Sequence, residues 1–244
     1  MYDTQQCASE TIPDTESTDW LVACFTNGRT DRSAYVIDQT DMYDYHSDHT
    51  DTGYDDVDAT VTRLTLGVNY GEVSGDFNIH SVYVWDKELN NREMKVVTRA
   101  LRKELGGVPD LSPVGTPIVS AISDLRAYYM RFLLATRPAQ SINIFSEFNG
   151  VTVPDRAGGK YPVTLTEGMA TLVSKGPGAF NGAKGKLVSL EGTTATKLLW
   201  PAFSIPKKFT ICSVTRYSGV TKNRILNTNG APYSYGANWL HGHH

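Results

Sequence analysis

The sequence predicts an all-β protein, an antiparallel sandwich of two sheets with one or two short helices. Short apolar and β-branched runs recur along the chain, bounded by Gly, Asn, Asp or Pro. These runs do not alternate with long helical patterns, as a parallel sheet of βαβ units would require. The length of 244 residues, with 40% hydrophobic content, suits one large all-β domain or two ordinary ones.

The predicted strands fall into two groups, with a helix and a connector between them. The first group comprises 20–28, 33–38, 60–67 and 77–86. The second group comprises 141–150, 170–176, 185–192, 197–200, 209–217 and 223–230.

A helix is expected directly after the first group, within residues 88–107. Met94, Val97, Leu101 and Leu105 recur at helical spacing. Asn90 with Glu93 forms a capping-box pattern at the start, and Gly106 provides a stop.

Residues 107–140 read as a connector. Their first ten residues, "GVPDLSPVGT", and the next position hold three prolines, which exclude a helix interior and a central strand. The stretch 118–138 is apolar enough for a second helix or a pair of strands, and its periodicity leaves both open.

The string "LTLGVNYGEVSGDFNIHSVYVWDKELNNREMKVV" (64–97) resembles the closing part of a laminin-G-like or pentraxin-like domain. These domains are concanavalin A-like jelly rolls. Conversely, residues 141–219 resemble the opening part of such a domain, with an "F-x-G" turn, an "LVSLEG" strand and an "F-T-I" strand in family order. The beginning of the family pattern therefore follows its end.

The resemblance implies a permuted jelly roll in three segments. Residues 1–106 correspond to the second half with its closing helix, 107–140 to a partly helical connector, and 141–244 to the first half. Either both halves fold on each other within one chain, or each half completes a sandwich with a neighbouring chain or repeat. We favour the first arrangement, because domain termini often lie close together.

The resemblance also implies a disulfide between Cys24, in "WLVAC", and Cys212, in "FTIC". It would place the strands at 20–26 and 209–216 side by side. The alternative is two buried free thiols in neighbouring strands, since free Cys packs as a small hydrophobe. Cys7 is then left over, to join another chain or a cysteine elsewhere.

Composition and motifs exclude several classes of function. Net charge is −3 and the basic residues are scattered, which argues against a nucleic-acid partner. No apolar run reaches the roughly 20 residues that a membrane span needs. The glucanase pattern E-x-D-x-x-E, the G-x-S-x-G elbow, the P-loop and H-E-x-x-H are all absent, so no catalytic residues are assigned and no cofactor is expected.

Two polar stretches are candidates for ligand binding. The acidic stretch 38–58 offers Asp41, Asp44 and Asp48 as oxygen ligands for calcium, although a solvated loop is the simpler interpretation. Near the C-terminus, aromatic and amide side chains suited to stacking on sugar rings are interleaved: Asn229, Tyr233, Tyr235, Asn238 and Trp239. Core-facing strand aromatics are the commoner case.

Three functions remain from this reasoning. The first is a non-enzymatic structural or adhesive module of a larger, repetitive extracellular assembly, secreted or at the cell surface, whose partners are other extracellular proteins or copies of itself. The second is a lectin-like glycan-binding domain. The third, a glycan-cleaving enzyme, needs a carboxylate pair that the sequence does not offer.

Overall fold

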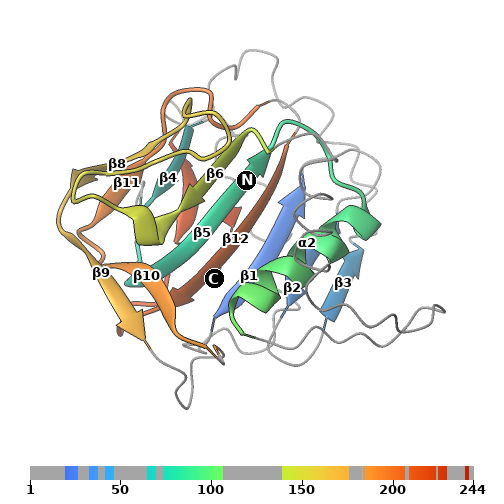
Figure 1. Cartoon of the computed structure of the whole chain (residues 1–244), viewed down its shortest axis with the longest axis horizontal. Helices are drawn as coiled ribbons and strands as arrows, with labels where there is room; N and C mark the ends of the chain where they lie inside the picture. The colour runs from blue at the N-terminus through green and yellow to red at the C-terminus, as the bar shows by residue number, and fades with distance from the viewer. Residues whose placement is uncertain are drawn as a thin grey trace, which may run out of the picture.

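The computed structural model of the chain describes residues 20–26, 33–37, 42–46, 65–69, 74–106, 139–175, 183, 185–206, 209–223, 225–229 and 240–241. Within them, two antiparallel sheets pack as a sandwich, and one α-helix and one 3₁₀ turn accompany them (Figure 1). The predicted class, two antiparallel sheets with little helix, is confirmed.

The larger sheet has eight strands in the order β3-β2-β1-β12-β5-β10-β9, and β6 also pairs with β5. Its strands are β1 (Leu21–Thr26), β2 (Ser33–Ile37), β3 (Met42–His46), β5 (Phe77–Trp85), β6 (Ser141–Ile144), β9 (Ala170–Lys175), β10 (Leu187–Gly192) and β12 (Thr210–Tyr217).

The smaller sheet has six strands in the order β14-β13-β4-β11-β8-β7. Its strands are β4 (Thr65–Val68), β7 (Thr152–Val153), β8 (Val163–Glu167), β11 (Lys197–Leu199), β13 (Leu226–Asn229) and β14 (Leu240–His241).

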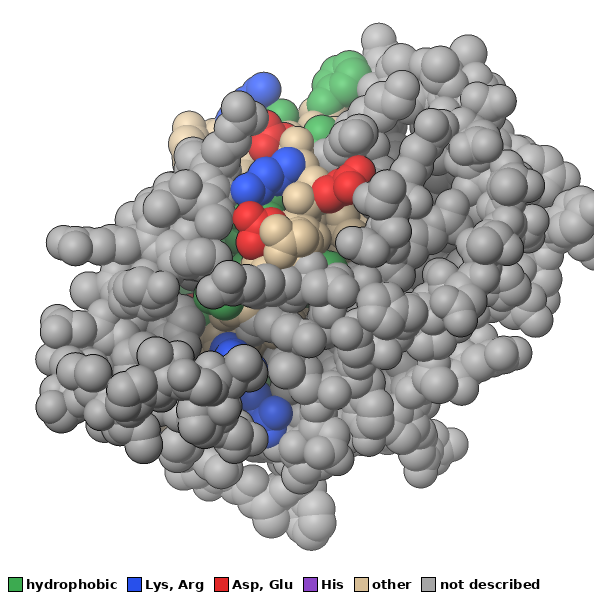
Figure 2. Space-filling model, turned by 90° about the vertical axis from the view of Figure 1, so that its right-hand side faces the viewer, with side chains coloured by type: hydrophobic (Ala, Val, Ile, Leu, Met, Phe, Trp, Pro, Cys, Tyr) green, Lys and Arg blue, Asp and Glu red, His purple; other side chains and the backbone are tan. Residues whose placement is uncertain are grey.

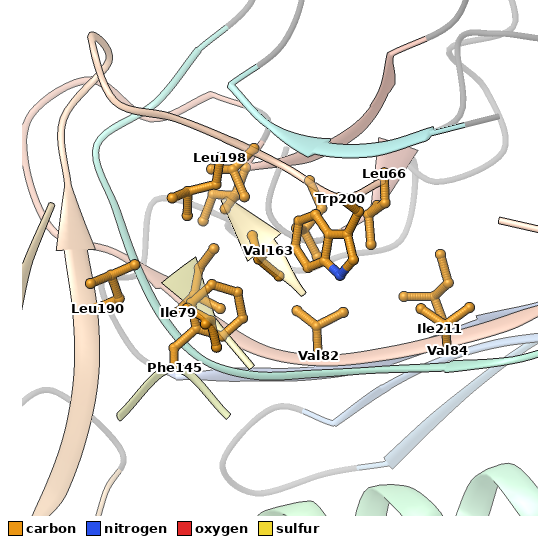
Figure 3. Packing of buried hydrophobic residues seen from close by; sticks show 14 of the residues in the cluster. Leu66, Ile79, Val82, Val84, Phe145, Val163, Leu190, Leu198, Trp200 and Ile211 are labelled. Atoms are coloured by element: carbon orange, nitrogen blue, oxygen red, sulfur yellow. The ribbon is translucent and has the colours of Figure 1, made fainter. Parts of the chain in front are cut away.

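The main core lies between the two sheets. Figure 3 shows side chains from both sheets pointing toward one another across this space. Trp200, which follows β11, is 1% exposed, and its ring centroid lies 6.1 Å from that of Phe145. Its indole Nε1 donates a hydrogen bond of 2.8 Å to Oδ1 of Asn143, so the one polar atom of the ring is satisfied inside the core.

The outer face of the larger sheet carries a second apolar cluster under the helix α2 (Asn91–Glu104), which crosses β1 and β2 in Figure 1. The four predicted apolar positions are buried, three in this helix and one in the turn that follows it: Met94, Val97, Leu101 and Leu105. The predicted helix is confirmed together with its ends. The Asn90 backbone N–H donates to Glu93 Oε2 at 2.8 Å, the Glu93 N–H donates to Asn90 Oδ1 at 3.0 Å, and Gly106 has a φ of 75°.

A β-bulge in β5 changes which of its residues face the core between the sheets. Ile79 and Val82 both face the core between the sheets, although alternation would place residues three apart on opposite faces. The pairing with β12 shifts register between Val214 and Thr215, which leaves His80 as the extra residue. His80 and Ser81 therefore both fall between the two core-facing positions.

The two parts of the chain contribute interleaved strands. We call residues 20–106 the first part and residues 139–241 the second part. In the larger sheet β12, from the second part, lies between β1 and β5 from the first. In the smaller sheet β4, from the first part, lies between β13 and β11 from the second. The predicted adjacency of the strands at 20–26 and 209–216 is confirmed.

Several segments differ from the expectation: β7, β8 and β14 were not predicted, and two further differences have a clear physical reason. The predicted strand 141–150 ends at Ile144, and the 3₁₀ turn η2 (Phe145–Glu147) follows, which buries the Phe145 ring in the core. The acidic stretch 38–58, interpreted as a loop, contains the strand β3. Its alternating Met-Tyr-Asp-Tyr-His sequence pairs with β2, so β-propensity overrides the charge there.

Candidate functional site at the seam between the two parts

The most distinctive feature of the described structure is the seam at which the first part meets the second. It consists of the strand pairs β1–β12, β12–β5, β5–β10 and β5–β6 in the larger sheet and β4–β13 and β4–β11 in the smaller. Side chains from both parts meet along it on the outer face, in the core and at one end of the sandwich.

A disulfide joins Cys24 of β1 to Cys212 of β12 across the seam. The two residues are directly opposite each other in the strand register, with Cα atoms 4.0 Å apart. Both are buried on the outer face in the cluster under α2, with Trp20 and Val214 among their neighbours in that cluster. The disulfide that the family resemblance implied is therefore present, and it links the two parts covalently.

A row of three polar side chains crosses the same face. Arg216 of β12, Asn78 of β5 and Glu191 of β10 occupy directly opposite positions in the register. The Asn78 side-chain amide donates to Glu191 Oε2 at 3.1 Å, and the Arg216 guanidinium carbon lies 5.5 Å from the ring centroid of Trp20. Arg216 and Trp20 are 7% and 4% exposed, so this cation–π contact is largely desolvated and ties β12 to the start of β1.

The bulge residue His80 anchors the end of α2. Its Nδ1 lies 2.9 Å from the carbonyl oxygen of Val188, and because a carbonyl only accepts, Nδ1 carries a proton in this contact. Nε2 lies 3.6 Å from Glu104 Oε2 at the helix C-terminus, and the Tyr83 hydroxyl donates to Glu104 Oε1 at 3.4 Å. Burial, and then the nearby Glu104 carboxylate, raises the pKa of the Tyr83 phenol. These contacts hold the last helical turn against β5.

At one end of the sandwich, Asp76 holds two loops of the second part. Its carboxylate accepts hydrogen bonds of 3.2 Å from the backbone N–H groups of Thr194 and Thr221. Gly219 approaches this carboxylate so closely that a Cβ there would collide with it. The short β10–β11 turn and the loop after β12 are therefore both fixed to the first part.

Asn69, near Asp76, also holds the β10–β11 turn against the first part. Its side-chain amide nitrogen lies 3.0 Å from the Thr193 carbonyl and 3.1 Å from that of Thr196, and it also donates to Gly75, whose N–H bonds back to Asn69 Oδ1. Asn69 is fully buried with a φ of 57°, a conformation that asparagine tolerates better than most residues. Each of these hydrogen bonds satisfies a backbone group at the seam.

Sequence reasoning identified none of these polar anchors. One further anchor, Asp155, was also missed, although the sequence around it carries a local signal. Asp155 accepts hydrogen bonds from the backbone of Ile142, Ala157 and Tyr161 at 2.8 to 3.0 Å. The Pro154-Asp155 pair is a turn-initiating combination, because Asp bonds to backbone N–H groups a few residues later. Asn69 and Asp76 carry no comparable local pattern, since their partners in the second part lie more than a hundred residues away.

Only one residue of each predicted ligand-binding set lies among the described residues. Asp44 lies in β3 opposite Tyr35, whereas Asp41 and Asp48 lie outside the described residues. Asn229 ends β13 opposite Thr65. The other glycan-binding candidates, Tyr233, Tyr235, Asn238 and Trp239, and the extra Cys7 also lie outside the described residues. Both hypotheses therefore stay predictions, and the described side chains contain no group of three or more potential metal ligands.

Surface charge is mixed where it is described. On the side shown in Figure 2, the described surface is a narrow strip in which Lys or Arg side chains lie beside Asp or Glu side chains. Ion pairs join Lys197 to Glu167 at 2.7 Å, and Arg156 to Glu147 through two hydrogen bonds that lower the pKa of the Glu147 carboxyl. Such exposed pairs contribute little to stability.

Among the described helices there is none that is long and apolar enough to cross a membrane. No family model matches the chain, and no curated protein or solved structure matches it either.

Proposed function

We propose that this chain is a non-enzymatic structural or adhesive module that works outside the cell as one unit of a larger, repetitive assembly. The observation that carries the proposal is the covalent seam: the Cys24–Cys212 disulfide joins the two parts at the middle of the larger sheet. Disulfides of this kind persist in oxidising compartments and are rare in the cytosol. A module built to stay folded outside the cell gains from such a link.

The use of the buried polar side chains supports the same role. Asn69, Asp76, Asn143 and Asp155 direct their polar atoms mainly to backbone groups and to the indole of Trp200. Groups committed in this way hold loops and strands in place. This use of the buried polar side chains favours a rigid structural module over a catalytic site.

We further propose that the sandwich is a concanavalin A-like jelly roll of the laminin-G or pentraxin type in permuted order. Support comes from the family motifs in 64–97 and 141–219 together with the interleaving of strands from both parts. The closing strand of the family pattern, β5, pairs along its length with β12, which comes from the opening half. A permuted order of the two halves keeps the pairing of β5 with β12 and changes only where along the fold the chain begins and ends.

Fractionation of the source cells with an antibody to this chain tests the location. We expect the protein in the extracellular or cell-surface fraction, with Cys24 and Cys212 resistant to alkylation until a reductant is added. Recovery in the cytosol with both thiols free would contradict the proposal. A glycan array run with the purified chain separates adhesion through protein contacts from lectin activity, since saturable binding to one glycan class would favour the latter.

A further inference from the structure

The contacts of the seam do not require both parts to belong to the same molecule. The pairs β1–β12, β12–β5, β4–β13 and β4–β11 each join one strand of the first part to one of the second. The same is true of the Asp76, Asn69 and Asn78 side-chain bonds that cross to residues 191–221. The first part of one copy and the second part of another would form the same sandwich with the same contacts.

Each part alone would present open strand edges. Without β12, the edges of β1 and β5 that face each other would both be unpaired, and without β4 the same would hold for β13 and β11. Unpaired edges next to buried apolar faces drive association with another chain. The complementary edge is carried by every other copy of this chain.

We infer that copies of this chain exchange their two parts, so that the partner at the seam is a second copy and the Cys24–Cys212 disulfide forms between molecules. This inference rests on the proposed function, because exchange is the step that would link modules into an assembly. In the covalent step, the two thiols release two protons and two electrons and form one S–S bond. Oxidised glutathione, or another small disulfide, accepts the electrons and becomes two thiols.

Concentration decides between the closed and the exchanged forms. The two parts are continuous through residues 107–138, a length that can span at most about 115 Å. Two parts joined in one chain commonly meet at an effective concentration on the order of a millimolar. In dilute solution each chain therefore closes on itself, whereas copies that are tethered together or packed at millimolar concentration exchange.

Two full-length variants test the exchange, both carrying Cys7→Ser. One also carries Cys24→Ser and the other Cys212→Ser, so neither can form the disulfide within its own chain. They are unfolded, mixed, and refolded at a concentration of about a millimolar with oxidised and reduced glutathione. We expect a covalent heterodimer well in excess of the two homodimers, and mass spectrometry should find the Cys24 peptide joined to the Cys212 peptide.

Controls make each outcome decisive. Random thiol oxidation would yield heterodimer and homodimers in the statistical ratio, and that result, or an absence of heterodimer, would overturn the inference. Circular dichroism checks that each variant folds. Should a single-cysteine variant not fold, two differently tagged Cys7→Ser chains that keep Cys24 and Cys212 are refolded together instead. A covalent dimer carrying both tags is then the expected product, and tagged monomers alone would refute exchange.

The outcome separates this inference from the proposed function. If no exchange occurs but the protein is found outside the cell with its disulfide intact, the structural module stands and exchange is wrong. If exchange occurs with a protein that fractionation finds in the cytosol, the seam behaves as inferred and the extracellular role is wrong.

Discussion

The phenol of Tyr83 lies on the outer face of the larger sheet, where the residue is 7% exposed and its hydroxyl donates to Glu104. Burial, and then the Glu104 charge, raises its pKa above the ordinary value of 10.0. Tyr217 of β12 is also buried, and burial raises its pKa in the same direction. Both groups prefer the neutral form in the folded chain more strongly than in the unfolded chain.

This preference predicts a loss of stability in alkali. An acid with a raised folded pKa contributes its stability below the unfolded pKa, near 10, and loses it as the pH rises above that value. For each pH unit above about 10, the free energy of unfolding should fall by up to about 1.4 kcal/mol per buried phenol. Urea unfolding of the chain and of Tyr83→Phe from about pH 9 to about pH 11 measures this slope. Equal slopes in the two proteins would contradict the assignment.

Residues whose role depends on local pattern could be predicted, and those whose partners are distant could not. The Asn90–Glu93 capping box was visible because both residues lie within one helical turn. Asn69 bonds to Thr193 and Thr196, and no local feature of "GVNYG" announces partners so far along the chain. The cysteine pair was accessible through family resemblance alone.

At the scale of elements, the capping box gives α2 a defined start. The side chain of Asn90 satisfies the Glu93 N–H, one of the backbone donors that a helix leaves free at its N-terminus. Asn90→Ala should therefore lower the free energy of unfolding by about 1 kcal/mol. Asn90→Asp keeps an acceptor oxygen and is the matched control, for which we expect a much smaller loss. Chemical denaturation of the three proteins measures the free energies of unfolding. An equal loss of stability in both variants would show that the acceptor oxygen at position 90 does not stabilise the helix.

Elements were predictable where pattern and composition agreed. Helix α2 and the long strands β5 and β12 have strong periodicity and lie where they were expected. The strand β3 was missed because its acidic composition favours a loop, while its alternating Tyr residues and its pairing with β2 favour a strand. In β6, tertiary packing of Phe145 ends the predicted strand early.

At the scale of the whole molecule, the seam depends on close backbone contact at Gly75. A Cβ on this residue of the first part would lie 2.9 Å from the backbone nitrogen of Asn223 in the second part. Gly75→Ala should therefore force the two parts apart and lower stability by about 1 to 3 kcal/mol. Gly158→Ala is the control, since nothing lies within 4 Å of the added carbon. Similar midpoints of denaturation for both variants would argue against tight packing at the seam.

The disulfide should stabilise the closed chain strongly. Its cysteines are 188 positions apart, and the chain-entropy model gives about 5 kcal/mol as an upper figure for so long a loop. A double Cys24→Ala, Cys212→Ala variant should unfold at lower urea concentration than the oxidised chain and at a concentration close to that of the reduced chain. An unchanged midpoint after reduction would show that the link carries no stability.

Family order, read from two separated stretches of sequence, predicted that the two parts pair through β1 and β12. The rest of the topology could not be predicted, because β4 and β12 are single strands inserted between strands of the other part and periodicity does not reveal partners. The position of β6 and β10 on the same side of β5, on either side of the His80 bulge, is likewise a consequence of packing.

The claim that the two parts form one mutually dependent sandwich is tested most directly by following both in a single unfolding experiment. Trp85 reports on the first part and Trp200 on the second, and both are 1% exposed in the folded chain. In each of two variants one of these residues is the only tryptophan left, because the other three of the chain are replaced by phenylalanine. Each variant is unfolded in urea and followed by both fluorescence and far-UV circular dichroism. Because both apolar clusters contain residues of both parts, we expect fluorescence and circular dichroism to give the same midpoint within each variant. Two separate transitions would show that the parts fold independently and would contradict the shared sandwich.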